Sequence, residues 1–355
     1  MQTISGTNYD IFFGATGYET LATLLLPSHY SKTFILVDEN TSQHCLPYFL
    51  GLLDTEIEIE IIELEAGEHH KNIATCSEVW SALSELGADR KSIVLNLGGG
   101  VISDLGGFVA CTFKRGIDFI NIPTTLLAMV DAAIGGKNGV DLDELKNQIG
   151  LIHEPKAVII DPQFLTTLPA NEMRSGLAEM LKHGLIFDAE YWNIFKNLTS
   201  LNTEHLDKLI HRSIQIKNTI VLQDIHESNV RKTLNFGHTL GHAIESYFLS
   251  QNTELKLLHG EAVAAGMILE SYLSKELKLL SQEEYHEIKY YINELFERIS
   301  FSSEAIESII ELLNFDKKNA FGRVQFVLLE NIGQATINHV VDKSLIYKAF
   351  NDYQC

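Results

Sequence analysis

The chain has 355 residues, of which 45% are apolar and 21% charged, as in a globular protein of roughly two domains. Its 27 basic and 47 acidic residues give a formal net charge of −20, which argues against a nucleic-acid partner because phosphate binding needs a basic face. The opening MQTISGTNYD lacks the pattern of a signal peptide, and no run approaches the ~20 apolar residues that span a bilayer. We therefore predict a cytoplasmic protein without membrane contact.

The four cysteines are scattered and form no CxxC pair. This spacing argues against disulfide bonds and against a zinc site built from thiolates. Any metal site would then use histidine and carboxylate ligands.

Short β-rich runs alternate with helical patterns in the first half of the chain. The runs cover residues 33–38, 55–64, 92–100, 118–125 and 157–162. Strands separated by segments of helix length indicate a mostly parallel sheet. The pattern predicts an α/β domain over residues 1–170.

From residue 171 the apolar residues follow helical periods, for example over 205–221 and 283–299. One exception is residues 324–337, where two β-rich runs flank a glycine and predict a hairpin. Residues 249–256 are expected to form an exposed connection. The pattern predicts a second, mainly helical domain over residues 171–355.

The segment SIVLNLGGGVISDLGGFVA (92–110) is a strand that leads through glycines into a helical pattern. Such a turn lets a phosphate approach the backbone and the start of the helix, although the spacing is not GxGxxG and a simple tight turn is the alternative. Asp38 ends an earlier strand, where an acidic side chain often holds a ribose, and Glu68 and Lys71 follow the next one. We expect these loops to meet at one edge of the sheet.

A polar cluster follows, with Arg115, Asp131, Lys137, Lys146 and Asn147 close together in a strongly acidic chain. Lysines beside glycine pairs suit contact with phosphate or an oxyanion, while an ordinary solvated loop is the alternative. Thr124 and Thr125 could contact a nucleotide or merely end a strand.

Histidines and one glutamate mark the second half of the chain. Glu179 and Lys182 lie three residues apart in an apolar helical segment, and His238 and His242 lie one helical turn apart. Glu179, His238 and His259 together offer two imidazoles and one carboxylate, the usual ligand set of a catalytic divalent metal. A lone buried histidine is more often a packed core residue, so the alternative to a metal site is that these histidines pack in the core.

Several motifs together resemble the 3-dehydroquinate synthase family of the sugar phosphate cyclases. They are GGGVISDLGGFVA, RGIDFINIPTTLLAMVDAAIGGKNGVD, KNQIG, AEMLKHG, RKTLNFGHTLGHAIE, LHGEAVAAGM and DKK, spread over roughly residues 10–350. The resemblance implies an α/β N-terminal, Rossmann-like NAD-binding domain with a mostly parallel sheet. It also implies a mainly α-helical C-terminal metal-binding domain, a dehydroquinate synthase-like architecture, and a homodimer.

The resemblance also assigns site residues. Zn²⁺ or Co²⁺ would be ligated by Glu179, His238 and His259. NAD would be contacted by Asp38, Glu68, Lys71, Gly99, Gly100, Asp104, Thr124, Thr125, Lys146, Thr166 and Thr167. The substrate would be held by Asp131, Lys137, Asn147, Lys182, Lys217, Arg231, Asn235, His242 and a lysine of DKK (Lys317 or Lys318). Of these, His242, Lys182, Asp131 and Lys137 are the expected catalytic residues, and Arg115 is expected to reach the phosphate from a neighbouring subunit.

The implied activity is a lyase reaction of the shikimate pathway, which leads to chorismate and the aromatic amino acids. 3-Deoxy-D-arabino-heptulosonate 7-phosphate would become 3-dehydroquinate and phosphate, with NAD transiently reduced and then regenerated, and His242 would relay a proton. One departure from the family is that Ala132 and Ala133 follow Asp131 where serines are common.

Three alternatives remain. The first is another sugar phosphate cyclase, of the valiolone or inosose type, whose substrate lacks the carboxylate. A carboxylated substrate is favoured over this alternative by Lys217, Arg231, Asn235 and the DKK lysines. The second is a metal-dependent polyol dehydrogenase, which would release NADH. The third is a non-catalytic NAD-binding regulator.

Overall fold

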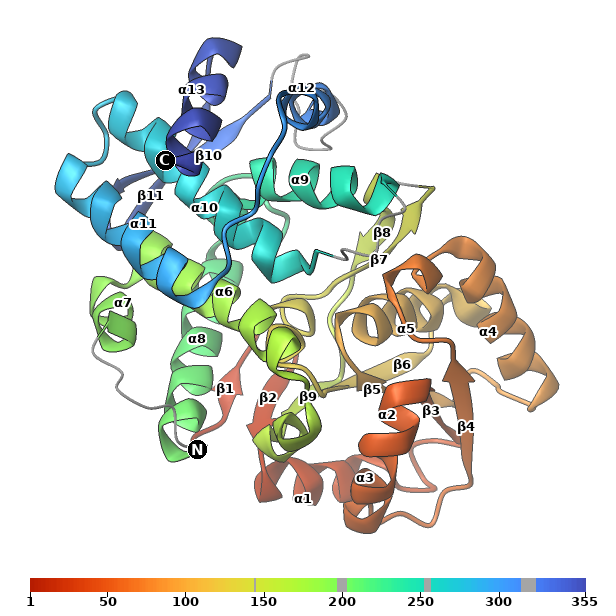
Figure 1. Ribbon diagram of the computed structural model, residues 1–355. Coiled ribbons are helices and arrows are strands. Elements are labelled where there is room, and N and C mark those ends of the chain that lie inside the picture. The colour runs from red at the N-terminus through yellow and green to blue at the C-terminus, as the bar shows by residue number, and fades with distance from the viewer. Residues whose placement is uncertain (144, 197–202, 252–256, 314–323) are drawn as a thin grey trace. The chain divides into compact units, whose positions relative to one another are not determined.

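The computed structural model describes residues 1–143, 145–196, 203–251, 257–313 and 324–355, with side chains of the helix that begins at 203 described from residue 205. The chain divides into two compact units, Met1–Pro169 and Ala170–Cys355. Figure 1 draws unit 1 from red to yellow and unit 2 from yellow-green to blue. The change of sequence pattern placed this division after residue 170.

Unit 1 is built on a seven-stranded sheet in the order β1-β2-β9-β6-β5-β3-β4. Only β1 and β2 pair antiparallel, and all other neighbours are parallel. The strands are β1 Ile4–Ser5, β2 Asp10–Phe13, β3 Thr33–Asp38, β4 Ile59–Leu64, β5 Ile93–Gly98, β6 Asp118–Pro123 and β9 Ala157–Ile160. The five strands predicted from sequence are confirmed as β3, β4, β5, β6 and β9.

Four strands of unit 1 were not predicted. β1 and β2 are two and four residues long, too short for a clear period. The other two, β7 Lys137–Leu142 and β8 Leu145–Ile152, form a separate antiparallel hairpin. Its sequence mixes glycines and lysines and lacks a clear two-residue period, so no strand was predicted there.

Helices complete unit 1. They are α1 Ala15–Leu24, α2 Glu39–His44, α3 Leu46–Leu52, α4 Ile73–Glu85 and α5 Gly100–Thr112, with 3₁₀ helices η1 Glu68–His70, η2 Phe113–Arg115 and η4 Pro162–Thr167 and the π-helical turn η3 Ala128–Ala132. Side chains of α4, α5 and β7 pack on one face of β3 and β5 in a single apolar core. Both faces of the central strands are covered, which explains their nearly continuous apolar sequences.

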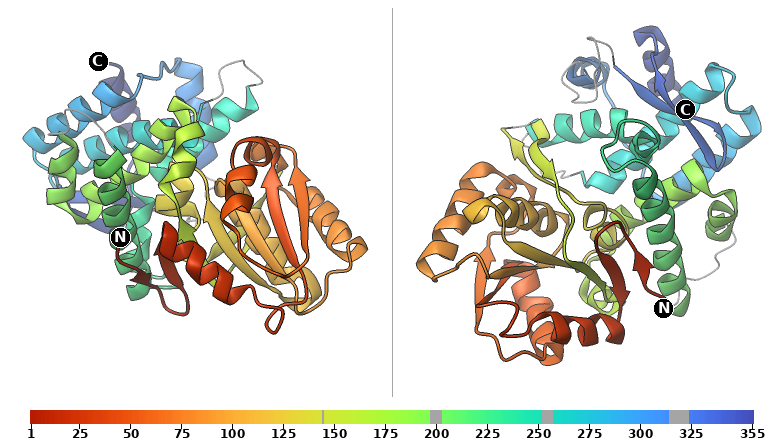
Figure 2. Two further views of the ribbon diagram at one scale, coloured as in Figure 1. Left: turned by 90° about the horizontal axis from the view of Figure 1, so that it is seen from below. Right: turned by 180° about the vertical axis from the view of Figure 1, so that it is seen from behind.

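Unit 2 is mainly helical and is organised around α10 (Figures 1 and 2). Its elements are α6 Ala170–Phe187, α7 Ala189–Lys196, α8 Thr203–Gln223, η5 Val230–Asn235, α9 His238–Ser250, α10 His259–Glu276, α11 Gln282–Leu295, α12 Ser303–Leu312, β10 Phe326–Asn331, β11 Gln334–His339 and α13 Lys343–Gln354. Every residue of α10 from Ala262 to Ser274 is buried, so this helix forms the centre of the unit.

The predicted hairpin at 324–337 is confirmed as β10 and β11, joined by a turn at Gly333 with φ +95°. The predicted connection at 249–256 begins within the last turn of α9, and residues 252–256 lie outside the described residues. In the part of the chain that the structure describes, no helix has both the length and the apolar composition to cross a membrane.

Candidate functional site

The carboxyl ends of the parallel strands of unit 1 bring most of the predicted nucleotide-binding residues to one edge of the sheet. Strands β3, β5, β6 and β9 end at Asp38, Gly98, Pro123 and Ile160. The segments that follow carry the predicted residues Asp38, Gly99, Gly100, Thr124, Thr125, Thr166 and Thr167. Ligands of open α/β sheets bind at this edge.

The glycine segment forms a tight strand-to-helix turn. Gly99 is the N-cap of α5, and because it has no side chain, no side-chain hydrogen bond caps the helix. A Cβ at Gly98 would lie 2.5 Å from Ile102 Cβ, and one at Gly99 would lie 3.0 Å from Thr125 Cγ2. The start of α5 therefore presents backbone N–H groups and the positive end of the helix dipole at the sheet edge.

Asp38 has a local structural task at this edge. Its Oδ1 accepts hydrogen bonds from the backbone N–H (2.8 Å) and the hydroxyl (3.0 Å) of Thr41, and Thr41 Oγ1 in turn accepts from the backbone N–H of Asp38 at 2.9 Å. This capping box starts α2 and fixes the direction of the carboxylate.

Five predicted residues of unit 1 form two ion pairs and one ammonium–amide contact next to the glycine turn. The ammonium of Lys71, which is 4% exposed, donates to Asp104 Oδ2 at 2.6 Å and to Asn147 Oδ1 at 2.7 Å. Lys146 donates to Glu68 Oε1 at 3.1 Å. Burial alone would lower the pKa of Lys71, but the carboxylates of Asp104, Glu68 and Asp141 raise it above its usual range.

The β7–β8 hairpin carries part of this cluster. Asn147 has a left-handed backbone (φ +51°), and its N–H donates to Asp141 Oδ1 at 2.6 Å. The N–H of Asp141 donates to the Lys71 carbonyl at 2.9 Å. Asp141, which was not among the predicted site residues, thus connects the hairpin to the loop of Lys71. The solvated-loop alternative for this segment is wrong, although Lys137, the first residue of β7, is exposed.

Asp131 lies in the π-helical turn η3, which begins five residues after β6 ends. A buried amide pair supports this turn: Asn96 donates to Asn121 at 2.9 Å, and Asn121 donates to the Ala133 carbonyl at 3.2 Å. π-Helical turns occur often at functional sites. Ala132, at the position of a common family serine, lies 3.4 Å from a Cβ built on Gly100.

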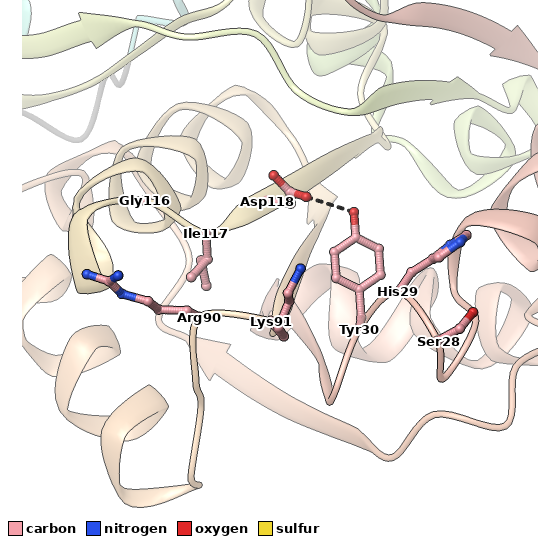
Figure 3. A pocket seen from close by; sticks show the side chains of 8 residues that line it. All are labelled: Ser28, His29, Tyr30, Arg90, Lys91, Gly116, Ile117 and Asp118. Carbon is pink, nitrogen blue, oxygen red and sulfur yellow. Dashed lines mark hydrogen bonds between the residues drawn. The ribbon is translucent and has the colours of Figure 1, made fainter.

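Arg115 lies at the opposite, amino edge of the sheet. It follows α5, is exposed, has φ +72°, and lies three residues before the start of β6. A polar pocket beside it is lined by residues 28–30, 90–91 and 116–118, and Figure 3 shows the hydrogen bond from the Tyr30 hydroxyl to Asp118 (2.9 Å). No residue of this pocket was predicted as a site residue. Within unit 1, Arg115 does not join the residues at the carboxyl edge.

Glu179 and Lys182 form a buried ion pair on α6 of unit 2. Glu179 is 0% and Lys182 1% exposed, and the ammonium contacts Glu179 Oε2. Burial alone would raise the pKa of Glu179, but Lys182 and His238 hold it well below its usual range. These residues are therefore not an ordinary surface pair.

The second carboxylate oxygen of Glu179 faces two histidines. Oε1 lies 3.3 Å from His238 Nε2 and 3.6 Å from His259 Nε2. Oε1 is buried and has no hydrogen-bond partner among the described residues. The other ring nitrogens are engaged: His238 Nδ1 lies 3.0 Å from the Phe236 carbonyl and His259 Nδ1 lies 3.1 Å from Glu245 Oε2. Three potential ligand atoms thus converge.

The surroundings shift the pKa values of the two histidines in opposite directions. Burial, together with the Lys182 cation, lowers the pKa of His238 to about 4. Burial would also lower the pKa of His259, but the carboxylates of Glu245 and Glu179 raise it to about 9. A metal ion bound here would therefore displace a proton from His259.

His242 lies one helical turn after His238, as its spacing predicted. Its ring centroid is 5.2 Å from that of His238 and 5.6 Å from that of His259, and its side chain is partly exposed. One nitrogen of each of the three rings lies within 4.8 Å of the others. The geometry therefore allows either Glu179 or His242 to complete a ligand set with His238 and His259.

Glycines set the close helix crossings that bring these groups together. A Cβ at Gly260, next to His259, would lie 2.2 Å from the Ser175 carbonyl oxygen of α6. A Cβ at Gly266 would lie 2.0 Å from the carbonyl oxygen of Gly237, just before α9. The backbones of α6, α9 and α10 therefore approach as closely as they do only because these positions lack side chains.

The start of α9 is held by a buried carboxylate. Gly237 has φ +77°, and its N–H donates to Glu270 Oε2 at 2.6 Å, while the N–H of Leu240 donates to Glu270 Oε1 at 3.1 Å. Asn235 was predicted within this helix start, but it ends the preceding helix η5. Its amide donates to Glu227 Oε1 at 2.8 Å.

The remaining predicted residues of unit 2 are cationic. Arg231 is 1% exposed and donates to the Ile225 carbonyl at 2.7 Å, and Lys217 of α8 is 6% exposed. The loop before Arg231 is fixed by Asp224, whose Oδ2 accepts the N–H groups of Asn229 (2.6 Å) and Arg231 (3.1 Å). Lys317 and Lys318 lie outside the described residues.

Three carboxylates that contact predicted site residues or their helices were missed from the sequence, namely Asp141 in unit 1 and Glu245 and Glu270 in unit 2. Glu245 comes seven residues after His238, which places both on one face of a helix. Glu270 stands in the apolar run VAAGMILESYL, where a buried charge needs partners. These two signals were available, whereas the role of Asp141 depends on a hairpin that the sequence did not predict.

Comparison with known proteins assigns the family. Residues 61–175 match the model of the 3-dehydroquinate synthase N-terminal domain, and residues 176–319 match that of its C-terminal domain. The 3-dehydroquinate synthase of Parabacteroides distasonis is 42% identical over 327 residues, which are 92% of each chain. The chain belongs to the 3-dehydroquinate synthase family. A synthase of this family from Prochlorococcus marinus is 39% identical over 90% of this chain and 89% of its own.

Solved structures of other proteins share the fold of this chain. The 2-epi-5-epi-valiolone synthase of Streptomyces hygroscopicus, solved with NAD⁺ and Zn²⁺, has a TM-score of 0.86 at 28% identity over 100% of this chain and 99% of its own. A 2-deoxy-scyllo-inosose synthase gives 0.84 at 24% identity over 99% and 100%. An iron-containing alcohol dehydrogenase gives 0.69 at 17% identity over 99% of each chain. The predicted α/β and helical architecture is confirmed.

Proposed function

We propose that this chain is a 3-dehydroquinate synthase that converts 3-deoxy-D-arabino-heptulosonate 7-phosphate to 3-dehydroquinate and phosphate. The sequence relatives of this name span about nine-tenths of the chain. The observation that carries the proposal is the convergence of Glu179 Oε1 with the Nε2 atoms of His238 and His259 in a chain of this family. The enzyme would be a lyase that eliminates phosphate and closes a carbocycle.

The three atoms suit a divalent metal. Two ligand atoms that each lie 2.0–2.1 Å from a tetrahedral Zn²⁺ are about 3.3–3.4 Å apart. The separations of 3.3 and 3.6 Å are close to this value, and the orphaned, buried Oε1 gains a partner when a cation binds. Nitrogen and carboxylate donors fit Zn²⁺ or Co²⁺. The related valiolone synthase was solved with Zn²⁺ and NAD⁺, which supports the same two cofactors here.

When bound, NAD would supply hydride transfer, and the metal ion would polarise the substrate oxygen that loses its proton. The residues of this chain would bind and orient an anionic sugar phosphate. Its carboxylate and phosphate would be met by Lys137, Asn147, Lys182, Lys217, Arg231, Asn235 and a lysine of the DKK motif, while Asp131 would accept hydrogen bonds from substrate hydroxyls. A chain of net charge −20 needs such a local concentration of cations to bind an anion.

His242 is the proposed proton relay. It is partly exposed and lies one turn from His238, so it can contact substrate while Glu179, His238 and His259 hold the metal. An imidazole suits this role because it ordinarily titrates near neutrality.

NAD is proposed to bind at the carboxyl edge of the unit 1 sheet. The start of α5 would take its pyrophosphate, and Asp38 its ribose through the oxygen that does not cap α2. Glu68, Lys71, Asp104 and Lys146 already form one cluster there. Arg115, at the other edge, is proposed to reach the phosphate of the substrate in a second subunit of a homodimer.

Two related activities are the alternatives. Another sugar phosphate cyclase would share the metal and NAD sites but use a substrate without a carboxylate, and buried Arg231 and Lys217 favour the carboxylated one. A polyol dehydrogenase would resemble the alcohol dehydrogenase neighbours and release NADH.

The deciding experiment measures phosphate release from the heptulosonate phosphate with NAD at one-tenth of the substrate concentration. A synthase regenerates NAD, so phosphate release should exceed the added NAD several-fold without NADH accumulation at 340 nm. Removal of metal with a chelator should abolish this activity, and Zn²⁺ or Co²⁺ should restore it. Steady NADH formation from a polyol without phosphate release would contradict the proposal.

A further inference from the structure

We propose that Glu245 is a positioning residue that orients His259 for metal binding. The inference rests on the proposed metal site of Glu179, His238 and His259. It adds a residue from α9 that acts on a ligand of α10 without touching the metal itself.

The His259 ring lies between two carboxylates. Its Nδ1 lies 3.1 Å from Glu245 Oε2, and its Nε2 lies 3.6 Å from Glu179 Oε1. When Nδ1–H donates to Glu245, the lone pair of Nε2 points to the place where Glu179 Oε1 and His238 Nε2 converge. A rotated or flipped ring would lose this bond, so Glu245 fixes both the direction and the tautomer of the ring.

Burial makes the contact hard to replace. Glu245 is 4% exposed and follows the buried residues Ala243 and Ile244 on α9. A carboxylate in such a place is costly unless it is hydrogen-bonded. Its position on α9, seven residues after His238, puts it on the same face as that ligand. One helix thus supplies a ligand and the group that orients a second ligand.

The two histidines are oriented by different acceptors. His238 Nδ1 faces the neutral carbonyl of Phe236 at 3.0 Å, whereas His259 Nδ1 faces a charged carboxylate. A carboxylate partner raises the basicity of a ligating imidazole as well as fixing its orientation. Substitution of Glu245 should therefore weaken one metal ligand and leave the other unchanged.

The expected effect is on metal affinity. Glu245→Gln keeps an acceptor oxygen but removes the charge, and we expect an affinity for Co²⁺ about 10-fold lower. Glu245→Ala removes both, and we expect a loss of about 100-fold. In both variants the three ligands remain, so the Co²⁺ absorption spectrum should keep the shape of the wild type.

The experiment titrates Co²⁺ into metal-stripped full-length protein in competition with a chromophoric chelator and records the visible spectrum. Glu276→Gln is the matched control, because this glutamate is 37% exposed at the far end of α10 and pairs with Lys275 at 2.9 Å. The control should bind Co²⁺ like the wild type. Circular dichroism checks that each variant is folded, and the isosteric Gln variant serves if the Ala variant unfolds.

Wild-type affinity in folded Glu245→Gln and Glu245→Ala would overturn the positioning role. A changed Co²⁺ spectrum that matches that of His259→Ala would also overturn it, because Glu245 would then be a ligand itself. Failure of the wild type to bind Co²⁺ would instead contradict the metal site of the proposed function, and the inference would fall with it. The two failures are therefore distinguishable.

Discussion

The two units of the molecule hold their predicted site residues in different ways. In unit 1, lysines and carboxylates from helices, a loop and a hairpin neutralise one another, as Lys71 does with Asp104 and Lys146 with Glu68. In unit 2, Glu179, His238 and His259 come from three crossing helices, and supporting carboxylates bind imidazole or backbone N–H groups. Unit 1 therefore depends on charge balance, and unit 2 depends on close backbone packing.

The largest stability effect is expected for Asp104→Ala in unit 1. The variant leaves the ammonium of the buried Lys71 without its carboxylate partner. Breaking a buried ion pair from one side costs about 3 kcal/mol or more. Urea unfolding should show this loss, whereas Lys146→Met, which breaks the more exposed pair with Glu68, should cost less than about 1 kcal/mol. Equal losses of unfolding free energy in the two variants would show that burial does not make the Lys71–Asp104 pair more important for stability than the Lys146–Glu68 pair.

Gly260→Ala tests the packing of unit 2. The added Cβ would lie 2.2 Å from the Ser175 carbonyl oxygen, so α6 and α10 must separate. Overpacking of this kind costs about 1–3 kcal/mol, and it should also reduce Co²⁺ affinity because Glu179 and His259 move apart. The control is Gly51→Ala on α3, where nothing lies within 4 Å of the new Cβ. A Gly260→Ala protein with wild-type stability and metal affinity would contradict the packing account.

A smaller, pH-dependent loss of stability is expected for Asp224→Asn. This variant tests the carboxylates of unit 2 that accept hydrogen bonds from backbone N–H groups. Although burial raises the pKa of Asp224, N–H donors of Asn229, Ser228 and Arg231 lower it overall from 3.8 to about 2. Its contribution to stability is therefore complete above about pH 4 and is lost as the pH falls toward 2. Urea unfolding should show the variant about 1–2 kcal/mol less stable at pH 6.

The difference between Asp224→Asn and the wild type should shrink below pH 4. A difference that stays constant down to pH 3 would show that the charge of Asp224 is not what stabilises the loop before Arg231.

The sequence predicted the parts of the fold that depend on local pattern. Strands β3, β5 and β9 are buried on both faces, so their apolar runs were plain. Since parallel strands align their carboxyl ends, the meeting of the Asp38, Gly99 and Thr124 segments could also be predicted. β7 and β8 could not, because a small hairpin rich in Gly and Lys lacks a clear two-residue period.

The candidate site was predicted less evenly. Helical spacing correctly placed His238 and His242 one turn apart and buried Glu179 with Lys182. Helical spacing could not reveal whether Glu179 or His242 shares a metal with His238 and His259, because that choice depends on how the helices cross. The spacing of Glu245 and the apolar run around Glu270 were visible in the sequence, but their partners were not, because those lie on another helix and become neighbours only through the crossings at Gly260 and Gly266.

The most direct test of the division of labour in unit 2 is the metal content of His238→Ala and His242→Ala, measured by elemental analysis after gel filtration. Our account predicts that His238→Ala loses its metal and that its turnover falls by about 10²–10³-fold or more. His242→Ala should keep one metal ion per chain while turning over slowly. Equal loss of metal in both variants would contradict the assignment of Glu179, rather than His242, as the third ligand.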